Sequence, residues 1–173
     1  MTKVIVLTGP ESTAKSTLTK ELARHFDGLW FPECAREYLS GRTSGYMYAD
    51  VEEIARKQIE QYDRALRSCR RLVFLDTWLI ITKVWFEWVF EEVPDWLEEA
   101  VRTHPVDLFL LCRPDIPWQP DPLRENGGEQ REKLFLTYQH ELQSRGFRYA
   151  GVEGHGDVRT MNAIKAVKLN LSP

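Results

Sequence analysis

The sequence predicts an α/β fold in which helices cover both faces of a parallel β-sheet. Short apolar runs alternate with longer helical segments along the chain. The first of these runs, Val4–Leu7, is apolar at every position, as in a strand that is buried on both faces. Because a helix between two strands returns the chain to the edge where the first strand began, alternating strands and helices form a parallel sheet.

Five strands and six helices are expected. The expected strands are Lys3–Thr8, Leu29–Phe31 (closed by Pro32), Leu72–Leu75, Asp107–Cys112 and Phe147–Val152. The expected helices are Ser16–Phe26, Val51–Arg71, Leu79–Glu92, a segment from Pro94 to about Thr103, Glu129–Arg145 and Asp157–Leu171. Apolar side chains at four-residue steps predict the first helix, Asp50 is expected to cap the second, and Gly146 ends the fifth. Residues 41–48 and most of 114–128 contain many Gly, Ser or Pro residues and are expected to lack regular structure.

Length, charge and cysteine content narrow the class of protein. We expect residues 1–173 to form a single domain with a small lid at about 114–130. The net charge of −3 argues against non-specific nucleic-acid binding as the main task. Three widely spaced cysteines without a CxxC pair indicate reduced thiols in a cytoplasmic protein. The most hydrophobic stretch, residues 79–90, contains two charges, so no membrane span is expected, and no secretory signal is visible.

The clearest motif is GPESTAKST at residues 9–17, between the first strand and the first helix. It follows the phosphate-binding P-loop pattern GxxxxGK[ST], except that Ala14 replaces the second glycine. Gly9 permits a turn at the strand end, and the backbone N–H groups that follow can surround phosphate oxygens. Lys15 would pair with the outer phosphates and Ser16 would ligate magnesium, unless the motif is a chance glycine turn before a helix. The expected nucleotide contacts are Gly9, Glu11, Ser12, Thr13, Ala14, Lys15, Ser16 and Thr17.

Ala14 is expected to affect nucleotide binding in one of two ways. If the backbone at this position is left-handed, the methyl group costs about 1–2 kcal/mol. If the position only has to approach a phosphate closely, the methyl group crowds the ligand instead. Either effect predicts weaker nucleotide binding, unless the loop geometry tolerates alanine.

Two acidic residues lie at expected strand ends, which is the edge where such sheets bind ligands. Asp76 follows the apolar run LVFL and would face magnesium through water. The alternative is that Asp76 or Thr77 caps the next helix. Glu33 follows the second strand and is the candidate general base toward a substrate hydroxyl, with Glu37 in reserve. The alternative for Glu33 is a solvated acidic residue at the start of a helix.

Phosphoryl transfer also needs cations over the migrating group and a lid that excludes water. Three arginines surround the proline-rich stretch: Arg113, Arg124 and Arg131. Arg124, in the segment DPLREN, is the best candidate for this role. Each of the three is as readily explained as a solvated surface residue.

Aromatic residues near these segments are candidates for stacking on the flat ring of a ligand. Trp78 directly follows the Asp76 site and Trp118 lies in the expected lid, so both are considered for this role. Trp85 and Trp88 lie at helical spacing and are expected in the core. The turn Gly154–Asp157, between the last strand and the last helix, is a plausible loop under the nucleotide base.

Taken together, these segments resemble the NadR-like P-loop family, in particular its ribosylnicotinamide kinase domain, over nearly the whole chain. The resemblance is carried in order by GPESTAKSTL, WFPECAREY, IARKQ, VFLDTW, DLFLLCRPDIPW, DPLREN, REKLF, RGFRY and a GxGDV-like turn. It implies a nucleoside-kinase-like, three-layer fold with a five-stranded parallel sheet of order 2-3-1-4-5. It also implies an ATP- and magnesium-dependent kinase that phosphorylates the 5′-hydroxyl of a nucleoside such as nicotinamide riboside. The family's other domains would not fit in this length, so a stand-alone kinase-like module is expected.

The resulting hypothesis assigns a role to each part of the site. The catalytic residues would be Lys15, Glu33 and Arg124, with Ser16 and Asp76 at the metal and a nucleotide and a nucleoside-like acceptor as ligands. Two positions depart from the family pattern, because Ala14 stands where the family has Gly and Trp78 stands where it has the second acid of a DTD triplet. These departures motivate an alternative, a nucleotide-binding regulatory or ATPase module with weak or no kinase activity. A kinase for another small metabolite is a third possibility.

Overall fold

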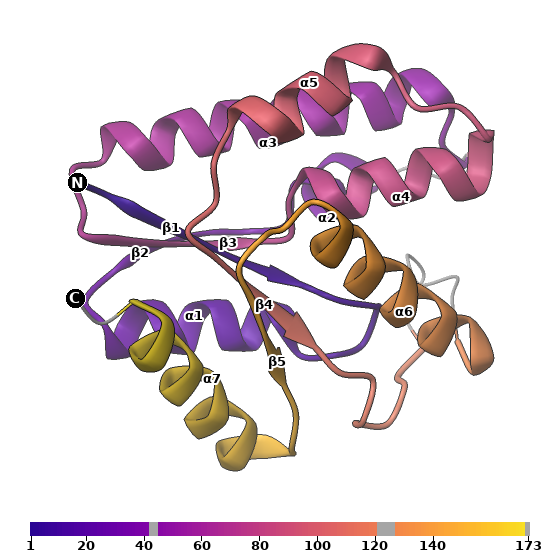
Figure 1. Cartoon of the computed structure of the whole chain (residues 1–173). Helices are drawn as coiled ribbons and strands as arrows, with labels where there is room; N and C mark the ends of the chain where they lie inside the picture. Colours follow the sequence, from indigo (N-terminus) through magenta and orange to yellow (C-terminus); the bar gives the residue numbers. More distant parts are fainter. Residues whose placement is uncertain (42–44, 121–126, 172–173) are drawn as a thin grey trace.

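The structure is a computed structural model, and the residues described are 1–41, 45–120 and 127–171. Its centre is a five-stranded parallel sheet of order β2-β3-β1-β4-β5, which confirms the expected sheet and strand order (Figure 1). The strands are β1 (Lys3–Thr8), β2 (Leu29–Phe31), β3 (Leu72–Asp76), β4 (Leu108–Cys112) and β5 (Tyr149–Val152). The helices are α1 (Lys15–His25), α2 (Cys34–Leu39), α3 (Tyr48–Arg67), α4 (Leu79–Phe90), α5 (Asp95–Thr103), α6 (Glu129–Ser144) and α7 (Gly156–Leu171).

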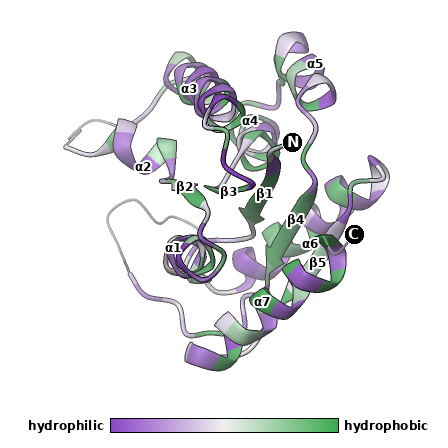
Figure 2. Ribbon diagram, turned by 90° about the vertical axis from the view of Figure 1, so that its left-hand side faces the viewer, coloured by the Kyte–Doolittle hydropathy of each residue, from purple (hydrophilic) through white to green (hydrophobic). Residues whose placement is uncertain are grey.

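The helices form a layer on each face of the sheet, because alternate side chains of a strand point to opposite faces. In β1, Val4 and Val6 belong to a core that includes residues of α3, α4, α5 and α6. Ile5 and Leu7 belong to a second core with α1 and α7. Figure 1 shows the two layers on opposite sides of the sheet. Apolar residues are concentrated in the strands between the layers (Figure 2), so the sheet is covered on both faces as expected.

The parallel register brings the carboxyl ends of neighbouring strands to one edge of the sheet. Leu7, near the end of β1, is aligned with Asp76 at the end of β3. Phe31, at the end of β2, is aligned with Leu75 of β3. The loop 9–17 and the segments that follow β2 and β3 therefore leave the sheet side by side, which is the arrangement needed for a shared site.

The beginning of α3 and the presence of α2 differ from expectation. The other helices and strands end within four residues of their predicted ends. The six-residue helix α2 is too short to give a periodic apolar pattern from which a helix could be predicted. α3 begins at Tyr48, so Asp50 lies inside its first turn and the prediction that Asp50 is the cap residue is wrong. Its carboxylate nevertheless accepts the backbone N–H of Met47 at 2.9 Å and the hydroxyl of Tyr38 at 3.0 Å, and so satisfies a donor at this helix end.

The most apolar helix, α4, contains a buried cation. Lys83 is 5% exposed, and its Nζ donates to Glu141 at 2.8 Å and to Glu87 at 2.5 Å. Arg145 also donates to Glu141, at 3.0 Å, so this ionic cluster joins α4 to α6. Across residues 1–41, 45–120 and 127–171, none of the helices is both long enough and apolar enough to cross a membrane.

The three cysteines are free and differ in their surroundings. Cys34 and Cys112 are buried, whereas Cys69 is exposed. Burial raises the pKa of Cys34 to about 12 and that of Cys112 to about 11. The two buried thiols are therefore protonated near neutral pH and serve as small apolar groups.

Candidate active site

The loop that follows β1 begins with a residue that must be glycine. Gly9 has φ +134°, and a Cβ at this position would lie 2.6 Å from the backbone oxygen of Cys112. That distance is shorter than any real Cβ contact, and the neighbouring atom belongs to the backbone of β4 and cannot move aside cheaply. The turn out of the sheet therefore packs directly against the end of β4.

Two non-glycine residues of the loop have left-handed backbone conformations. Ser12 has φ 55° and Ala14 has φ 62°. The structure thus selects between the two expectations for Ala14, because its methyl group sits on a left-handed residue, at a cost of about 1–2 kcal/mol relative to glycine. α1 begins at the next residue, Lys15, so its unpaired N–H groups face the loop.

The side chains of the loop are held by the loop's own backbone. The Nζ of Lys15 donates to the carbonyl oxygens of Gly9 at 3.0 Å and Pro10 at 2.7 Å. The buried hydroxyl of Thr13 donates to Pro10 at 2.9 Å. Ser16 and Thr17 lie exposed on the first turn of α1. This arrangement places an ammonium group, backbone N–H groups and a helix N-terminus around one small region, which is the chemistry of an anion site.

Asp76 ends β3 and faces the start of α1. It is 2% exposed, and its Oδ1 has no hydrogen-bond partner among the described residues. Burial raises the pKa of this carboxyl, whereas the charge of Lys15 and a hydrogen bond with Ser16 pull it down. The residue at the N-cap position of α4 is Trp78, which has no side-chain cap, so the alternative that Asp76 or Thr77 caps this helix is wrong.

A magnesium ion is compatible with this pair of oxygens. A buried carboxylate oxygen without a donor, beside a hydroxyl group, is the kind of ligand that a hard divalent cation prefers. Within the described part of the chain, no group of three His, Cys, Asp or Glu side chains could hold a metal ion. The ion would therefore need further oxygens from a bound phosphate, which is how magnesium is usually held in phosphoryl-transfer sites.

Glu33 lies at the N-cap position of α2, directly after the end of β2. Burial raises the pKa of its carboxyl, the charges of Asp76 and Glu11 add to the rise, and Lys15 opposes it. Arg36 opposes the rise as well and lies 3.9 Å from Glu33 in an ion pair. Glu33, Asp76, Glu11 and Lys15 thus lie near one another at the carboxyl edge of the sheet. The position of Glu33 at the start of a helix agrees with the alternative, but its side chain is 28% exposed and so is only partly solvated.

The guanidinium of Arg131 binds backbone carbonyl oxygens and is not left open to face a migrating phosphate. Its guanidinium donates to the backbone oxygens of Ser12 at 3.0 Å and Ile116 at 3.1 Å. Arg113 is exposed, lies 5.4 Å from the centre of the Phe135 ring, and is paired with Glu153 at 3.6 Å. Arg124, the best lid candidate by sequence, lies outside the described residues.

With the fold and this geometry established, the chain can be compared with known proteins. Residues 4–159 match the model of the AAA_28 family, which is described as an AAA domain. The chain belongs to this family.

The AAA_28 match is accompanied by likeness to NadR and to a nucleotide kinase. The trifunctional NAD biosynthesis/regulator protein NadR of Salmonella typhimurium (strain LT2) is 26% identical over 172 residues, covering 96% of this chain and 42% of that protein. A crystal structure of NadR in complex with NR has a TM-score of 0.87 at 25% identity, covering 99% of this chain and 52% of that one. The thymidylate kinase of Ehrlichia chaffeensis shares the fold, with a TM-score of 0.68 at 12% identity and coverage of 96% and 98%.

These comparisons confirm the resemblance to the NadR-like family and the nucleoside-kinase-like fold. The likeness to NadR and to a nucleotide kinase points to a kinase-like phosphotransferase fold with a nucleotide-binding P-loop. The chain spans about half the length, or less, of the NadR proteins that it matches.

In this AAA_28 member, Trp78 does not reach the site. Thr77 has φ 67°, which turns the chain, and Trp78 is 1% exposed, with its ring centroid 5.6 Å from that of Tyr62 in the core. The prediction that Trp78 stacks on a ligand is wrong, because the turn directs its side chain away from the strand edge. Trp88 is 40% exposed rather than in the core, whereas Trp118 is half-buried in the segment after β4 and stays a candidate.

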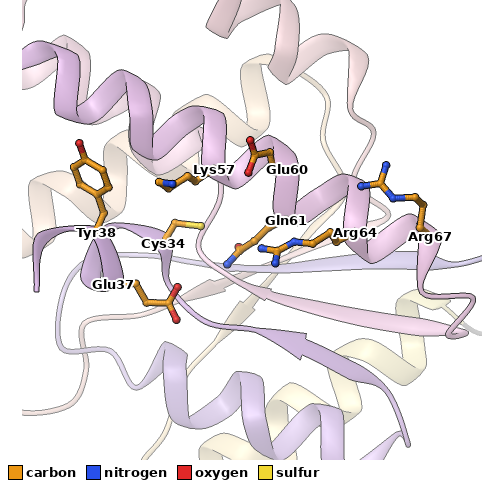
Figure 3. A pocket seen from close by; sticks show the side chains of 8 residues that line it. All are labelled: Cys34, Glu37, Tyr38, Lys57, Glu60, Gln61, Arg64 and Arg67. Atoms are coloured by element: carbon orange, nitrogen blue, oxygen red, sulfur yellow. The ribbon is translucent and has the colours of Figure 1, made fainter.

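Glu37, the reserve candidate for the base, lines a different hollow. A groove of about 560 Å³ lies between α2 and α3, and Glu37 forms part of its wall opposite Arg64 (Figure 3). The floor includes Cys34, and Gln61 of α3 donates to the carbonyl of Pro32 at 3.0 Å. The residues that line the groove do not include Lys15, Glu33 or Asp76. The groove is therefore separate from the site that these three residues form, although Cys34 in its lining directly follows Glu33 in the chain.

Two further features of the site were not predicted from the sequence. Tyr138 of α6 is buried, and burial together with the charges of Glu11 and Glu33 raises its pKa, so its phenol lies near these carboxylates. The spacing of apolar residues along α6 could have placed it on the inner face.

The second feature is an ion pair that holds the turn 154–157. Arg159 of α7 donates to Asp115 at 2.5 Å, and Asp115 accepts the N–H of Gly154 at 2.6 Å. The turn that was expected under the nucleotide base is therefore fixed to the segment after β4.

Proposed function

We propose that the chain is an ATP- and magnesium-dependent kinase that phosphorylates the 5′-hydroxyl of a nucleoside such as nicotinamide riboside. The observation that carries the proposal is the meeting of Lys15, Ser16, Asp76 and Glu33 at one edge of the sheet. Kinase chemistry needs a phosphate cradle, metal ligands and a base within one site. Lys15 serves the phosphates, Ser16 and Asp76 serve the metal, and Glu33 serves as the base.

The loop 9–17 binds the nucleotide phosphates. Its backbone N–H groups and the N-terminus of α1 present partial positive charge to the phosphate oxygens. Lys15 leaves the carbonyls of Gly9 and Pro10 and pairs with the outer phosphates, where it stabilises the charge that develops during transfer.

Ser16 and Asp76 hold the magnesium ion at the phosphates. When bound, the ion neutralises phosphate charge and orients the transferred group. The buried, unpartnered Oδ1 of Asp76 supports this role, because an ionised carboxylate in that position requires a cationic or hydrogen-bonding partner.

Glu33 accepts the proton of the acceptor hydroxyl at a carboxylate oxygen. Its raised pKa supports this role, because a base is most effective when its pKa approaches the working pH. Arg124 is proposed to lie over the transferred phosphoryl group and to offset its negative charge.

The acceptor is proposed from the relatives and not from the charge of the site. The carboxylates of Glu11, Glu33 and Asp76 are accompanied by three cations, those of Lys15, Lys20 and Arg36, so the charges favour neither sign. The crystal structure of NadR in complex with NR supports nicotinamide riboside as the acceptor.

The proposal is tested with purified protein, Mg-ATP and a panel of nucleosides that includes nicotinamide riboside. We expect formation of the mononucleotide, loss of product when magnesium is omitted, and turnover that is at least about 100-fold lower in Lys15→Ala. Phosphorylation of other nucleosides but not of nicotinamide riboside would keep the kinase class and overturn the acceptor.

The second candidate function is a nucleotide-binding regulatory or ATPase module with weak or no kinase activity. It is favoured by the left-handed backbone of Ala14, which is a strained residue in the middle of the phosphate loop. A protein that binds Mg-ATP but phosphorylates none of the nucleosides would support this candidate. Multiple turnover with any acceptor alcohol would exclude it.

A further inference from the structure

Arg131, the third residue of α6, is buried against the nucleotide loop. It is 6% exposed. Its Nη2 donates to the carbonyl oxygens of Ser12 at 3.0 Å and Ile116 at 3.1 Å, and its Nη1 donates to Ile116 at 3.2 Å. One guanidinium group thus connects three segments that are far apart in the sequence: the loop after β1, the segment after β4, and the start of α6.

Ser12 is held from a second side by the same segment. The backbone N–H of Gln119 donates to the Ser12 hydroxyl oxygen at 3.0 Å. The hydroxyl in turn donates to the carbonyl of Pro117 at 3.4 Å, which is a longer and weaker contact. The carbonyl and the hydroxyl of Ser12 are therefore each bound by residues outside the loop.

The backbone of Ser12 explains why such contacts matter. Its φ of 55° is unfavourable for a residue with a side chain. Conformations of this kind persist where surrounding groups fix them. A carbonyl that is bound by Arg131 stays directed out of the loop, which leaves the neighbouring N–H groups free to face an anion, as in other nests of backbone donors.

We propose that Arg131 is a positioning residue that keeps the loop 9–17 in its phosphate-accepting shape by binding the Ser12 carbonyl. The inference rests on the proposed function only in that the loop is taken to bind nucleotide phosphates. Arg131 acts through the backbone of Ser12 and not by contact with the ligand. An arginine suits this role because its planar fork reaches two carbonyls at once, whereas a lysine presents a single ammonium group.

The test compares Arg131→Ala and Arg131→Lys with Arg148→Lys as a matched control. Arg148 is an exposed arginine that also donates to a backbone carbonyl, that of Asn170 at 2.9 Å, but it lies at the amino end of β5, away from the loop. Hydrogen exchange of residues 9–17 and 113–120 is measured without nucleotide, and Mg-ATP affinity is measured by calorimetry. Steady-state kinetics give KM for each substrate and kcat.

We expect faster exchange in both segments of R131A, an increase of about tenfold in the Kd for Mg-ATP, and a smaller effect in R131K. The KM for ATP should rise while the KM for the acceptor and kcat stay close to those of the wild type. R148K should match the wild type in every measurement. If R131A fails to fold, as judged by its thermal transition, R131K decides the question.

Two results would overturn the inference. Weaker binding of Mg-ATP with unchanged exchange in 9–17 would mean that Arg131 contacts the phosphates itself. Faster exchange with unchanged affinity would mean that the shape of the loop at Ser12 does not control binding. If the wild-type protein binds no Mg-ATP, the proposed function fails, and the exchange measurement then decides by itself whether Arg131 fixes the loop.

Discussion

The Cβ position of Gly9 lies 2.6 Å from the carbonyl oxygen of Cys112, so the nucleotide loop begins in backbone contact with β4. Gly9→Ala forces these two backbone segments apart and also places a side chain at φ +134°. We expect the free energy of unfolding to fall by about 1–3 kcal/mol, as for other overpacked sites. Mg-ATP binding should fall below detection, because the displaced loop no longer presents its N–H groups. Urea denaturation and calorimetry measure the two effects.

Gly151→Ala is the control for this substitution. A Cβ at Gly151 in β5 has no heavy atom within 4 Å, so this variant should keep the affinity of the wild type. Equal losses of affinity in both variants would show that the Gly9 contact has no special role.

Ala14→Gly separates strain in the loop from crowding of the ligand. Ala14 has φ 62°, so its strain is a property of the folded loop, and relief of this strain stabilises the fold rather than the bound nucleotide. We expect the free energy of unfolding to rise by about 1 kcal/mol or less, since glycine also gains freedom in the unfolded chain. The Kd for Mg-ATP should change by less than about threefold. A gain in affinity of tenfold or more would instead favour the regulatory module with a loop impaired by Ala14.

Glu33→Gln tests the proposed base through its pH dependence. Because burial raises the pKa of Glu33, the carboxylate becomes available as a base only as the pH rises through this raised value. In the wild type, kcat/KM should therefore increase with pH on the acidic side and then level off. The variant should lose about 100-fold or more in kcat and also lose this acidic limb, with the Kd for Mg-ATP little changed. An unchanged pH profile in the variant would assign the proton transfer to another group.

Lys83→Met should be one of the most destabilising polar substitutions in the chain. It leaves the carboxylate of Glu141 without its closest cation in a mostly buried position, and we expect a loss of about 3 kcal/mol in the free energy of unfolding. Arg102→Met is the control, because the pair of Arg102 with Glu99 is exposed and screened by solvent, so its removal should leave the free energy of unfolding nearly unchanged. Denaturant titration of both variants measures the difference.

The same ionic cluster makes stability depend on pH. Burial alone would raise the pKa of Glu141, but the hydrogen bonds from Lys83 and Arg145 outweigh it and lower the pKa below 4.5. The resulting stabilisation is present above pH 4.5 and is lost as the pH falls through the lowered value. Lys83→Met should flatten this part of the stability curve, and a curve parallel to that of the wild type would contradict the assignment.

The parts of the fold that could be predicted are those with a local pattern. Short, mostly apolar runs predicted all five strands, and the spacing of Gly9 and Lys15 predicted the loop. Asp76 and Glu33 could be chosen as candidates because parallel strands deliver their carboxyl ends to one edge. The six-residue helix α2 could not be predicted, because its sequence is shorter than two helical turns.

The parts that could not be predicted depend on contacts between distant residues. The guanidinium of Arg131 binds a carbonyl 119 residues earlier in the chain, and no local pattern indicates that partner. The direction of Trp78 is decided by the left-handed turn at Thr77, which is unusual for a β-branched residue. For this reason, the absence of a second acid at position 78 does not by itself argue against the magnesium site proposed at Ser16 and Asp76. The role of Arg124 stays a prediction.

The unequal burial of the three cysteines gives the protein a built-in labelling position. Alkylating reagents attack thiolates, and the high pKa and burial of Cys34 and Cys112 protect both from such reagents. Cys69 lies exposed between α3 and β3, at the end of that strand opposite to Asp76. A maleimide dye or a nitroxide should therefore attach at one place without any substitution. The label would sit across the sheet from the loop, where it can report on distances without disturbing the residues that it observes.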